Sequence, residues 1–184
     1  MTLVNGLKQH PNDRGRTMQL LAIDVGGFTQ DILLLDTSQV LENSVKMVLP
    51  SATIVVARRI EQATAGRKDV LLTGVTMGGG PCRMALQRHL DAGLKAYATP
   101  DAARTLDDDL DKVRQMGVTL VSPDEARRIK GVAPIETRDI DLEAISRTLE
   151  TFQVTPGFDA VAVQLDFVGG GAGYLALATS SQPS

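Results

Sequence analysis

The sequence predicts an α/β fold with one mixed sheet, in which three antiparallel strands come first, parallel βα units follow, and helices lie on both faces. Two patterns carry this prediction. Three short apolar runs with short links fill the region up to residue 50, and helix-like and strand-like segments then alternate up to residue 164. A length of 184 residues with 43% hydrophobic content suffices for one core, so a single domain is expected.

The boundaries of this domain follow from composition. Residues 1–18 mix glycine, proline and asparagine with few apolar neighbours, which predicts a flexible leader. The folded lobe is expected over residues 19–167. Residues 168–184 begin near three consecutive glycines and end on Ser-Ser-Gln-Pro-Ser, which predicts an irregular tail.

Three strands are expected before the first helix. Residues 19–23 and 31–36 are apolar runs joined by a glycine turn, and residues 42–49 alternate between apolar and polar side chains up to Pro50. Because the links between these strands are short, an antiparallel meander is the expected arrangement.

The remainder of the chain is expected to alternate helices and strands. Ser51 is placed as the N-cap of a helix that Gly66 ends. Helices are expected at residues 52–65, 82–90, 101–116, 123–130 and 141–152, and strands at 69–73, 95–99, 118–121 and 159–164. Parallel crossovers between them would bring the strands at 70–72 and 160–163 into the same sheet as the first three.

The first glycine turn carries the sharpest functional signal. An acidic residue, Asp24, ends the first strand, and Gly26 and Gly27 form the turn before Thr29. Glycine lets backbone N–H groups approach a phosphate, Thr29 adds a hydroxyl donor, and Asp24 suits a hydrated magnesium ion. A glycine hairpin with a solvated aspartate explains the motif equally well, so the motif alone leaves both interpretations open.

A second glycine loop precedes the helix expected at 82–90. Gly78, Gly79 and Gly80 lie between a strand and Pro81, where free N–H groups and a helix dipole attract anions. Proline at the first helical position equally fits plain helix initiation, and glycines permit tight packing of a strand on a helix. The packing interpretation is the favoured one for this loop.

Several other polar residues are assigned ordinary roles. Asp107–Asp109 with Asp111 indicate a solvated acidic helix, since the calcium-loop glycine and glutamate are missing. His89 lacks an evident catalytic partner in the sequence and is expected to be partly exposed. Cys82 is expected to be a small buried packing residue, although a helix start can lower the pKa of a thiol.

Charge and cysteine content exclude several functions. Nineteen Lys and Arg against 22 Asp and Glu give a net charge of −3, and the basic residues form no patch that would indicate nucleic acid binding. One cysteine cannot build an iron–sulfur cluster or a disulfide within the chain, which fits a cytoplasmic protein. No run of residues is apolar and long enough for a membrane span.

The turn Ile23-Asp24-Val25-Gly26-Gly27 with Thr29 resembles the first phosphate loop of actin, sugar kinases and chaperone ATPases. The resemblance implies a ribonuclease-H-like fold, the N-terminal lobe of an actin-like ATPase. It also implies ATP and magnesium as cofactors, with Asp24 positioning the metal and Gly26, Gly27 and Thr29 holding phosphates. A nucleotide or a phosphorylated small molecule is therefore the expected ligand.

A closer resemblance covers residues 20–164. Its motifs are residues 24–36, 43–50, 73–81 and 97–105, and the family is an uncharacterised prokaryotic one often labelled "putative pyruvate formate-lyase activating enzyme". Two departures stand out. Phe28 replaces a small or hydroxylated residue, and residues 165–168 stand where relatives continue with Asp-His-Gly into a second lobe, so the second lobe is expected to be missing.

Three functions are weighed on these grounds. The leading one is a nucleotide- or phosphate-binding lobe that, in a complete form, would serve an ATPase or a phosphotransferase. The alternative is a non-catalytic scaffold or partner-binding domain. Radical-activase chemistry is judged against, because such enzymes cluster three cysteines around an iron–sulfur cluster and this chain has only Cys82.

Overall fold

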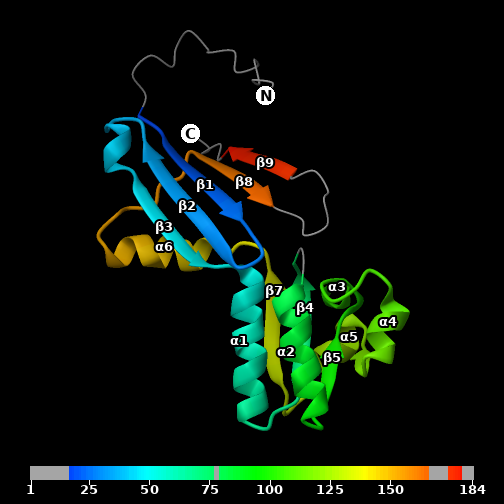
Figure 1. Cartoon of the computed structure of the whole chain (residues 1–184). Coiled ribbons are helices and arrows are strands. Elements are labelled where there is room, and N and C mark those ends of the chain that lie inside the picture. Colours follow the sequence, from blue (N-terminus) through cyan, green and yellow to red (C-terminus); the bar gives the residue numbers. More distant parts are fainter. Residues whose placement is uncertain (1–16, 77–78, 166–173, 180–184) are drawn as a thin grey trace.

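The strands form two sheets, where the sequence predicted one (Figure 1). A computed structural model describes residues 17–76, 79–165 and 174–179. The mixed sheet has the order β3-β2-β1-β8-β9 and consists of β1 Gln19–Val25, β2 Thr29–Asp36, β3 Val45–Pro50, β8 Ala160–Leu165 and β9 Tyr174–Thr179. The parallel sheet has the order β6-β5-β4-β7 and consists of β4 Val70–Val75, β5 Ala96–Ala98, β6 Val118–Leu120 and β7 Ala133–Arg138.

The antiparallel meander at the start of the chain is confirmed. β1 pairs with β2 and β2 with β3, both antiparallel, and β8 adds to β1 in parallel with Leu21 opposite Val161. The predicted irregular tail is wrong for Tyr174–Thr179, which form β9 and pair antiparallel with β8. The open edge of β8 supplies the backbone partners that composition alone did not indicate. The predicted leader lies outside the described residues up to residue 16.

The prediction that residues 70–72 and 160–163 share a sheet is wrong, and β7 explains why. β4 pairs in parallel with β5 on one edge and with β7 on the other, so neither edge of β4 is open to β1. No strand was predicted at Ala133–Arg138, where only Ile135 and Thr137 are buried. The inward face of β7 consists of Ala133, Ile135 and Thr137, and such a short face with one large apolar residue leaves a weak apolar pattern.

The helices match the predicted ones in order; α1 also has the predicted bounds, whereas the other helices differ in length or are split. They are α1 Ala52–Ala65, α2 Gly80–Asp91, α3 Pro100–Arg104, α4 Leu110–Gln115, α5 Pro123–Ala126 and α6 Leu142–Thr151, with a 3-10 turn at Leu41–Asn43. The helix expected at 101–116 is split, because Asp109 caps α4 by accepting from the N–H of Asp111. The helix expected at 123–130 is shortened to α5. None of the helices in the described ranges has the length and apolar character needed to span a membrane.

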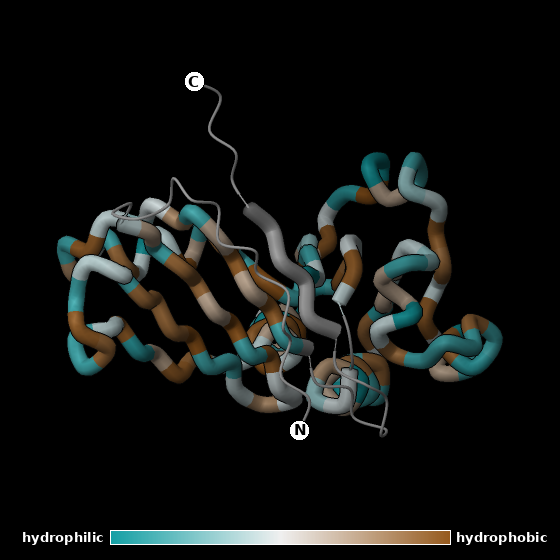
Figure 2. The backbone as a smooth tube through the Cα atoms, turned by 90° about the horizontal axis from the view of Figure 1, so that it is seen from above, coloured by the Kyte–Doolittle hydropathy of each residue, from teal (hydrophilic) through white to brown (hydrophobic). Residues whose placement is uncertain are grey.

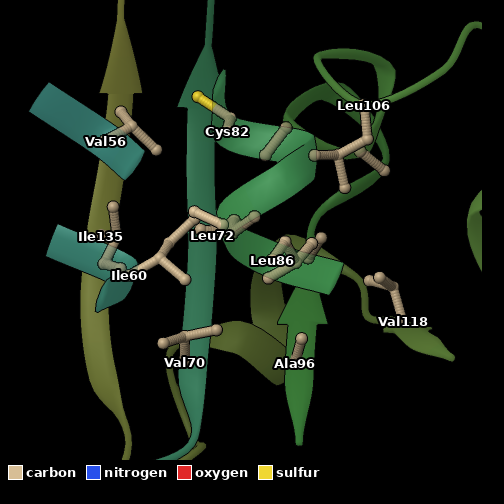
Figure 3. Packing of buried hydrophobic residues seen from close by; sticks show 14 of the residues in the cluster. Val56, Ile60, Val70, Leu72, Cys82, Leu86, Ala96, Leu106, Val118 and Ile135 are labelled. Carbon is tan, nitrogen blue, oxygen red and sulfur yellow. The ribbon is translucent and has the colours of Figure 1, made fainter. Parts of the chain in front are cut away.

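Each sheet has its own hydrophobic core. In the mixed sheet, α6 packs Ile145 and Leu149 against Leu21 and Ile23 of β1, while Asp24 on the alternate face is exposed. In the parallel sheet, α1 and α2 lie side by side over β4 and β7 (Figure 1). Figure 3 shows the side chains that meet in this second core: Val56, Ile60, Leu86, Val70, Leu72 and Ile135. Figure 2 shows the backbone from above, and hydrophobic residues alternate with polar ones along the strands of the mixed sheet.

Candidate functional site

A cavity of about 670 Å³ lies where the β1–β2 turn meets the first turns of α1 and α2. Residues from both predicted glycine loops line it, together with Asp139 after β7. The structure therefore joins two segments about fifty residues apart into one site. The lining residues are Val25, Gly26, Gly27, Phe28, Ser51, Ala52, Thr53, Ile54, Ala57, Arg58, Glu61, Gly79, Gly80, Pro81, Met84, Arg88 and Asp139.

The β1–β2 turn is held by its own hydrogen bonds. The N–H of Gly26 donates to the carbonyl of Thr29 at 2.9 Å, so this predicted phosphate donor is used within the turn. A Cβ on Gly26 would lie 3.2 Å from the same carbonyl oxygen, which makes glycine the best fit. The N–H of Gly27, by contrast, donates to no backbone carbonyl of the described residues, so it is available to a ligand.

Buried hydroxyls tie this turn to the start of α1. Ser51 occupies the predicted N-cap position, but its hydroxyl makes no capping bond and instead donates to the carbonyl of Gly27 at 3.1 Å. The hydroxyl of Thr53 donates to the same carbonyl at 2.9 Å. Since no side chain caps α1, the first N–H groups of this helix are left to face the cavity.

The start of α2 is shaped by a close approach of the backbone. A Cβ on Gly79 would lie 1.8 Å from the carbonyl oxygen of Thr105, so only glycine fits there. Nothing lies within 4 Å of a Cβ built on Gly80. The packing interpretation therefore accounts for Gly79, while Gly80 is unconstrained. Gly78 lies outside the described residues.

Asp139 lines the cavity although the sequence pattern did not predict it as a site residue. It follows β7, and its Oδ1 accepts a hydrogen bond of 2.6 Å from the buried hydroxyl of Thr76 after β4. The strand order runs from β4 through β5 to β6 on one side and returns to β7 on the other, so β4 and β7 flank the point where the order reverses. In parallel α/β sheets ligands bind at the carboxyl ends of the strands at such a point. Recognising β7 as a strand would have identified Asp139.

Charged side chains stand at the rim of the cavity. Arg88 lies 3.5 Å from Glu61 in an exposed ion pair. Arg58 also lines the cavity, and no carboxylate among the described residues pairs with it. An exposed pair exchanges readily with water, so Arg58 and, after exchange, Arg88 are the cations that the cavity offers to an anion.

Two predicted site residues lie outside the cavity lining. Asp24 is the last residue but one of β1 and lies on the face opposite Val25, where it is exposed and stands across from Asp31 of β2. Thr29 begins β2 and is exposed. The cavity therefore brings together Gly26, Gly27, Gly79 and Gly80, but not Asp24 or Thr29.

Cys82 and His89 are both structural. Cys82 is buried and its thiol donates to the carbonyl of Thr53 at 3.2 Å, and burial raises the pKa of this thiol to about 12. The expectation that His89 is partly exposed is wrong, since the ring is fully buried between Thr64 Oγ1 at 2.8 Å and the carbonyl of Lys95 at 3.1 Å. The His89 ring lies on the inner side of α2 and connects Thr64 of α1 to Lys95, the residue before β5.

One comparison with known proteins bears on this site. The family model described as "Putative pyruvate format-lyase activating enzyme (DUF1786)" matches residues 77–166, just under half of the chain. The match begins at the second glycine loop and ends at β8, so the β1–β2 turn and α1 lie outside it. No curated protein matches the sequence. The chain is thus similar to this family over the half that supplies Gly79, Gly80 and Asp139.

Proposed function

We propose that the cavity binds a nucleotide or another phosphorylated small molecule, with the phosphate at the glycine turn and the two helix starts. The main support for the proposal is that two helices, α1 and α2, begin at the same cavity. Gly27 and Arg58 line this cavity as well. The N-terminus of a helix presents unpaired N–H groups and the positive end of the helix dipole. Two of them facing one cavity favour a multiply charged anion.

The rest of the lining suits the organic part of such a ligand. Val25, Ile54, Pro81 and Met84 provide an apolar wall, and the ring of Phe28 is exposed at the cavity. Small-molecule sites typically combine an apolar wall with a few polar groups that set orientation. A base or another apolar moiety would lie on this wall while the phosphate contacts the backbone.

Asp139 is the carboxylate that we propose as the magnesium ligand. Mg²⁺ is usually held by one or two carboxylates together with phosphate oxygens and water. Asp139 lines the cavity, whereas Asp24, the residue that the resemblance implies, lies on the other face of β1. We expect Asp139 to hold a hydrated magnesium ion against a bound phosphate.

Calorimetric titration of the full chain tests the proposal. Inorganic phosphate, tripolyphosphate and ATP are each titrated with and without magnesium. We expect saturable binding that is weaker than micromolar, because the cavity is open at its rim and offers few side-chain contacts. No heat with any of the three anions would refute the proposal.

Three variants assign the roles. Arg58→Gln should weaken tripolyphosphate binding about tenfold, in keeping with one lost charge-assisted contact. Asp139→Asn should remove the dependence on magnesium, while Asp24→Asn should leave it unchanged. The opposite pattern for the two aspartates would return the metal to Asp24 and the implied actin-like arrangement.

Radical-activase chemistry is not part of the proposal, despite the description of the matching family. Iron–sulfur clusters are held by several cysteine thiolates. The chain has only Cys82, and its thiol is buried and bonded to a backbone carbonyl.

A partner-binding role is the second candidate, and exposed apolar side chains at the cavity favour it. Phe28 is 72% exposed and Met84 is 63% exposed. If these residues bind a protein partner and not a ligand, Phe28→Ser should leave the anion titrations unchanged. A loss of ATP binding with retained phosphate binding would instead assign Phe28 to the organic part of the nucleotide.

A further inference from the structure

The parallel sheet ends in an edge strand, β7. One edge of β7 pairs with β4, and no strand among the described residues pairs with the other edge (Figure 1). The N–H of Ala133 donates to the carbonyl of Asp69, the residue before β4. Successive residues of a strand direct their backbone groups to opposite sides. The odd-numbered residues of β7 therefore bond to β4, whereas the even-numbered residues Pro134, Glu136 and Arg138 direct their backbone groups outward.

The outward edge of β7 offers both a donor and an acceptor at Glu136 and at Arg138. Within the described part of the chain, no backbone or side-chain group bonds to the outward N–H and carbonyl groups of these two residues. Pro134 has no N–H, so this edge carries no unpaired donor there, and proline is tolerated in sheets at such edges. An open edge with unpaired groups is a template for another strand.

The side chains at this edge carry opposite charges on one face of the sheet. Ile135 and Thr137 are buried, and Ile135 lies in the core under α1 and α2. Glu136 and Arg138 therefore project from the opposite face, where both are exposed and pair with each other. An exposed ion pair of this kind is weak and exchanges readily, so both side chains are available to a second strand.

A second copy of β7 fits this edge in one antiparallel register. When Thr137 lies opposite Thr137 of the second copy, each Glu136 lies opposite the other copy's Arg138. Both residues of such a pair direct their backbone groups outward, so each pair exchanges two N–H···O bonds. Opposite charges that face each other across strands are favourable. A shift of two residues in either direction would bring two glutamates or two arginines together, which is unfavourable.

We propose that β7 joins two copies of this chain into a dimer with two-fold symmetry, in which the two parallel sheets become one continuous sheet. A two-fold interface uses the same patch on both copies, and the charge pattern at Glu136 and Arg138 is complementary to itself. The pairing covers an edge that is otherwise open to other strands. This inference does not depend on a ligand in the cavity.

Sedimentation velocity of the full chain over a concentration series tests the proposal. We expect the protein to approach twice the monomer mass at millimolar concentration. Glu136→Arg places an arginine opposite Arg138 of the second copy, and Arg138→Glu places a glutamate opposite Glu136. Because each change turns two attractive pairs into two repulsive ones, either variant should weaken self-association by about tenfold or more. A wild-type chain that stays monomeric at every concentration would overturn the proposal.

A mixture of the two variants gives the sharpest result. Glu136→Arg and Arg138→Glu oppose each other with unlike charges at both positions, so they should form a heterodimer although each is monomeric alone. The double variant Glu136→Arg with Arg138→Glu should regain self-association. Glu143→Arg on α6, also an exposed ion-pair residue, is the control and should leave the dimer unchanged. Equal melting temperatures exclude misfolding, and failure of the two variants to associate with each other would refute the assigned register.

Discussion

The first turns of α1 and α2 open on the same cavity but are held in place by opposite means. At α1, two buried hydroxyls, those of Ser51 and Thr53, donate to the carbonyl of Gly27. At α2, the absence of a side chain on Gly79 lets the backbone approach Thr105. A lost hydrogen bond can be replaced in part by water, but a steric clash with backbone cannot. The start of α2 should therefore tolerate far less change than the start of α1.

The largest effect is expected in the chemistry of Cys82, whose side chain lies in the core under α1 and α2 (Figure 3). Its thiol donates to the carbonyl of Thr53 and so connects the two helix starts. Burial raises its pKa from 9.0 to about 12, so at pH 8 the folded protein holds about a thousandfold less thiolate than the unfolded chain. Alkylation by iodoacetamide, followed by mass spectrometry, should be slower by about this factor in the folded state.

The same pKa sets a direction for stability. Since folding favours the protonated thiol, the stabilisation is complete below pH 9 and is lost as the pH rises towards 12. Denaturant unfolding between pH 8 and pH 10.5 measures this trend, with Cys82→Ala as the control that removes it. Alkylation of the folded chain at a rate within tenfold of the unfolded rate would contradict the buried position of Cys82.

The next largest effect is expected from Gly79→Ala. The new Cβ would lie 1.8 Å from the carbonyl oxygen of Thr105, so the loop between β4 and α2 must move. We expect a loss of about 3 kcal/mol in the free energy of unfolding, measured by urea denaturation. Gly80→Ala is the matched control, because nothing lies within 4 Å of its Cβ, and its change should stay within about 0.5 kcal/mol. Equal effects of the two substitutions would disprove the steric account of α2.

A smaller loss is expected at the start of α1. Thr53→Val keeps the shape of the side chain but removes a donor to the carbonyl of Gly27, and Ser51 still donates to the same oxygen. We expect the free energy of unfolding to fall by about 1–2 kcal/mol. The double variant Ser51→Ala with Thr53→Val should cost more than Thr53→Val alone, because the carbonyl then loses both donors. If the double variant is no less stable than the single one, the two hydroxyls do not hold the turn.

The smallest effect is expected from Gly26→Ala. Its Cβ would stand 3.2 Å from the carbonyl oxygen of Thr29, a contact that a shift of a few tenths of an ångström relieves. A loss below about 1 kcal/mol is expected, and phosphate affinity should be unchanged because the N–H of Gly26 already donates within the turn. A clear loss of phosphate binding with retained stability would show that this N–H leaves Thr29 to contact the ligand.

Sequence patterns predicted the local elements well and their partners less well. The meander of β1, β2 and β3 and the helix α1 followed from apolar periodicity and from the stop signals at Pro50 and Gly66. β7 was not predicted because its inward face, Ala133, Ile135 and Thr137, carries only one large apolar residue, and without β7 the prediction merged two sheets into one. The same omission hid Asp139.

The glycines of the candidate site were predicted correctly but its acidic residue was not, and this difference has a physical cause. Glycines report backbone needs locally, so Gly26, Gly27, Gly79 and Gly80 could be singled out and do line one cavity. Whether an acidic side chain reaches that cavity depends on which face of its strand it occupies and on which face the distant helices α1 and α2 lie. Asp24 satisfied the local pattern and lies on the other face of β1.

By itself, the sequence determined an α/β chain with an antiparallel start, one buried cysteine, and two glycine turns. These features depend on the periodicity of side chains and on the permitted backbone angles of single residues, which are local. The tertiary structure decided that β8 and not β4 pairs with β1, and that two helix starts share a cavity. Strand pairing and burial arise from competition among distant segments for the same edges and faces, and a local pattern does not record which segment wins.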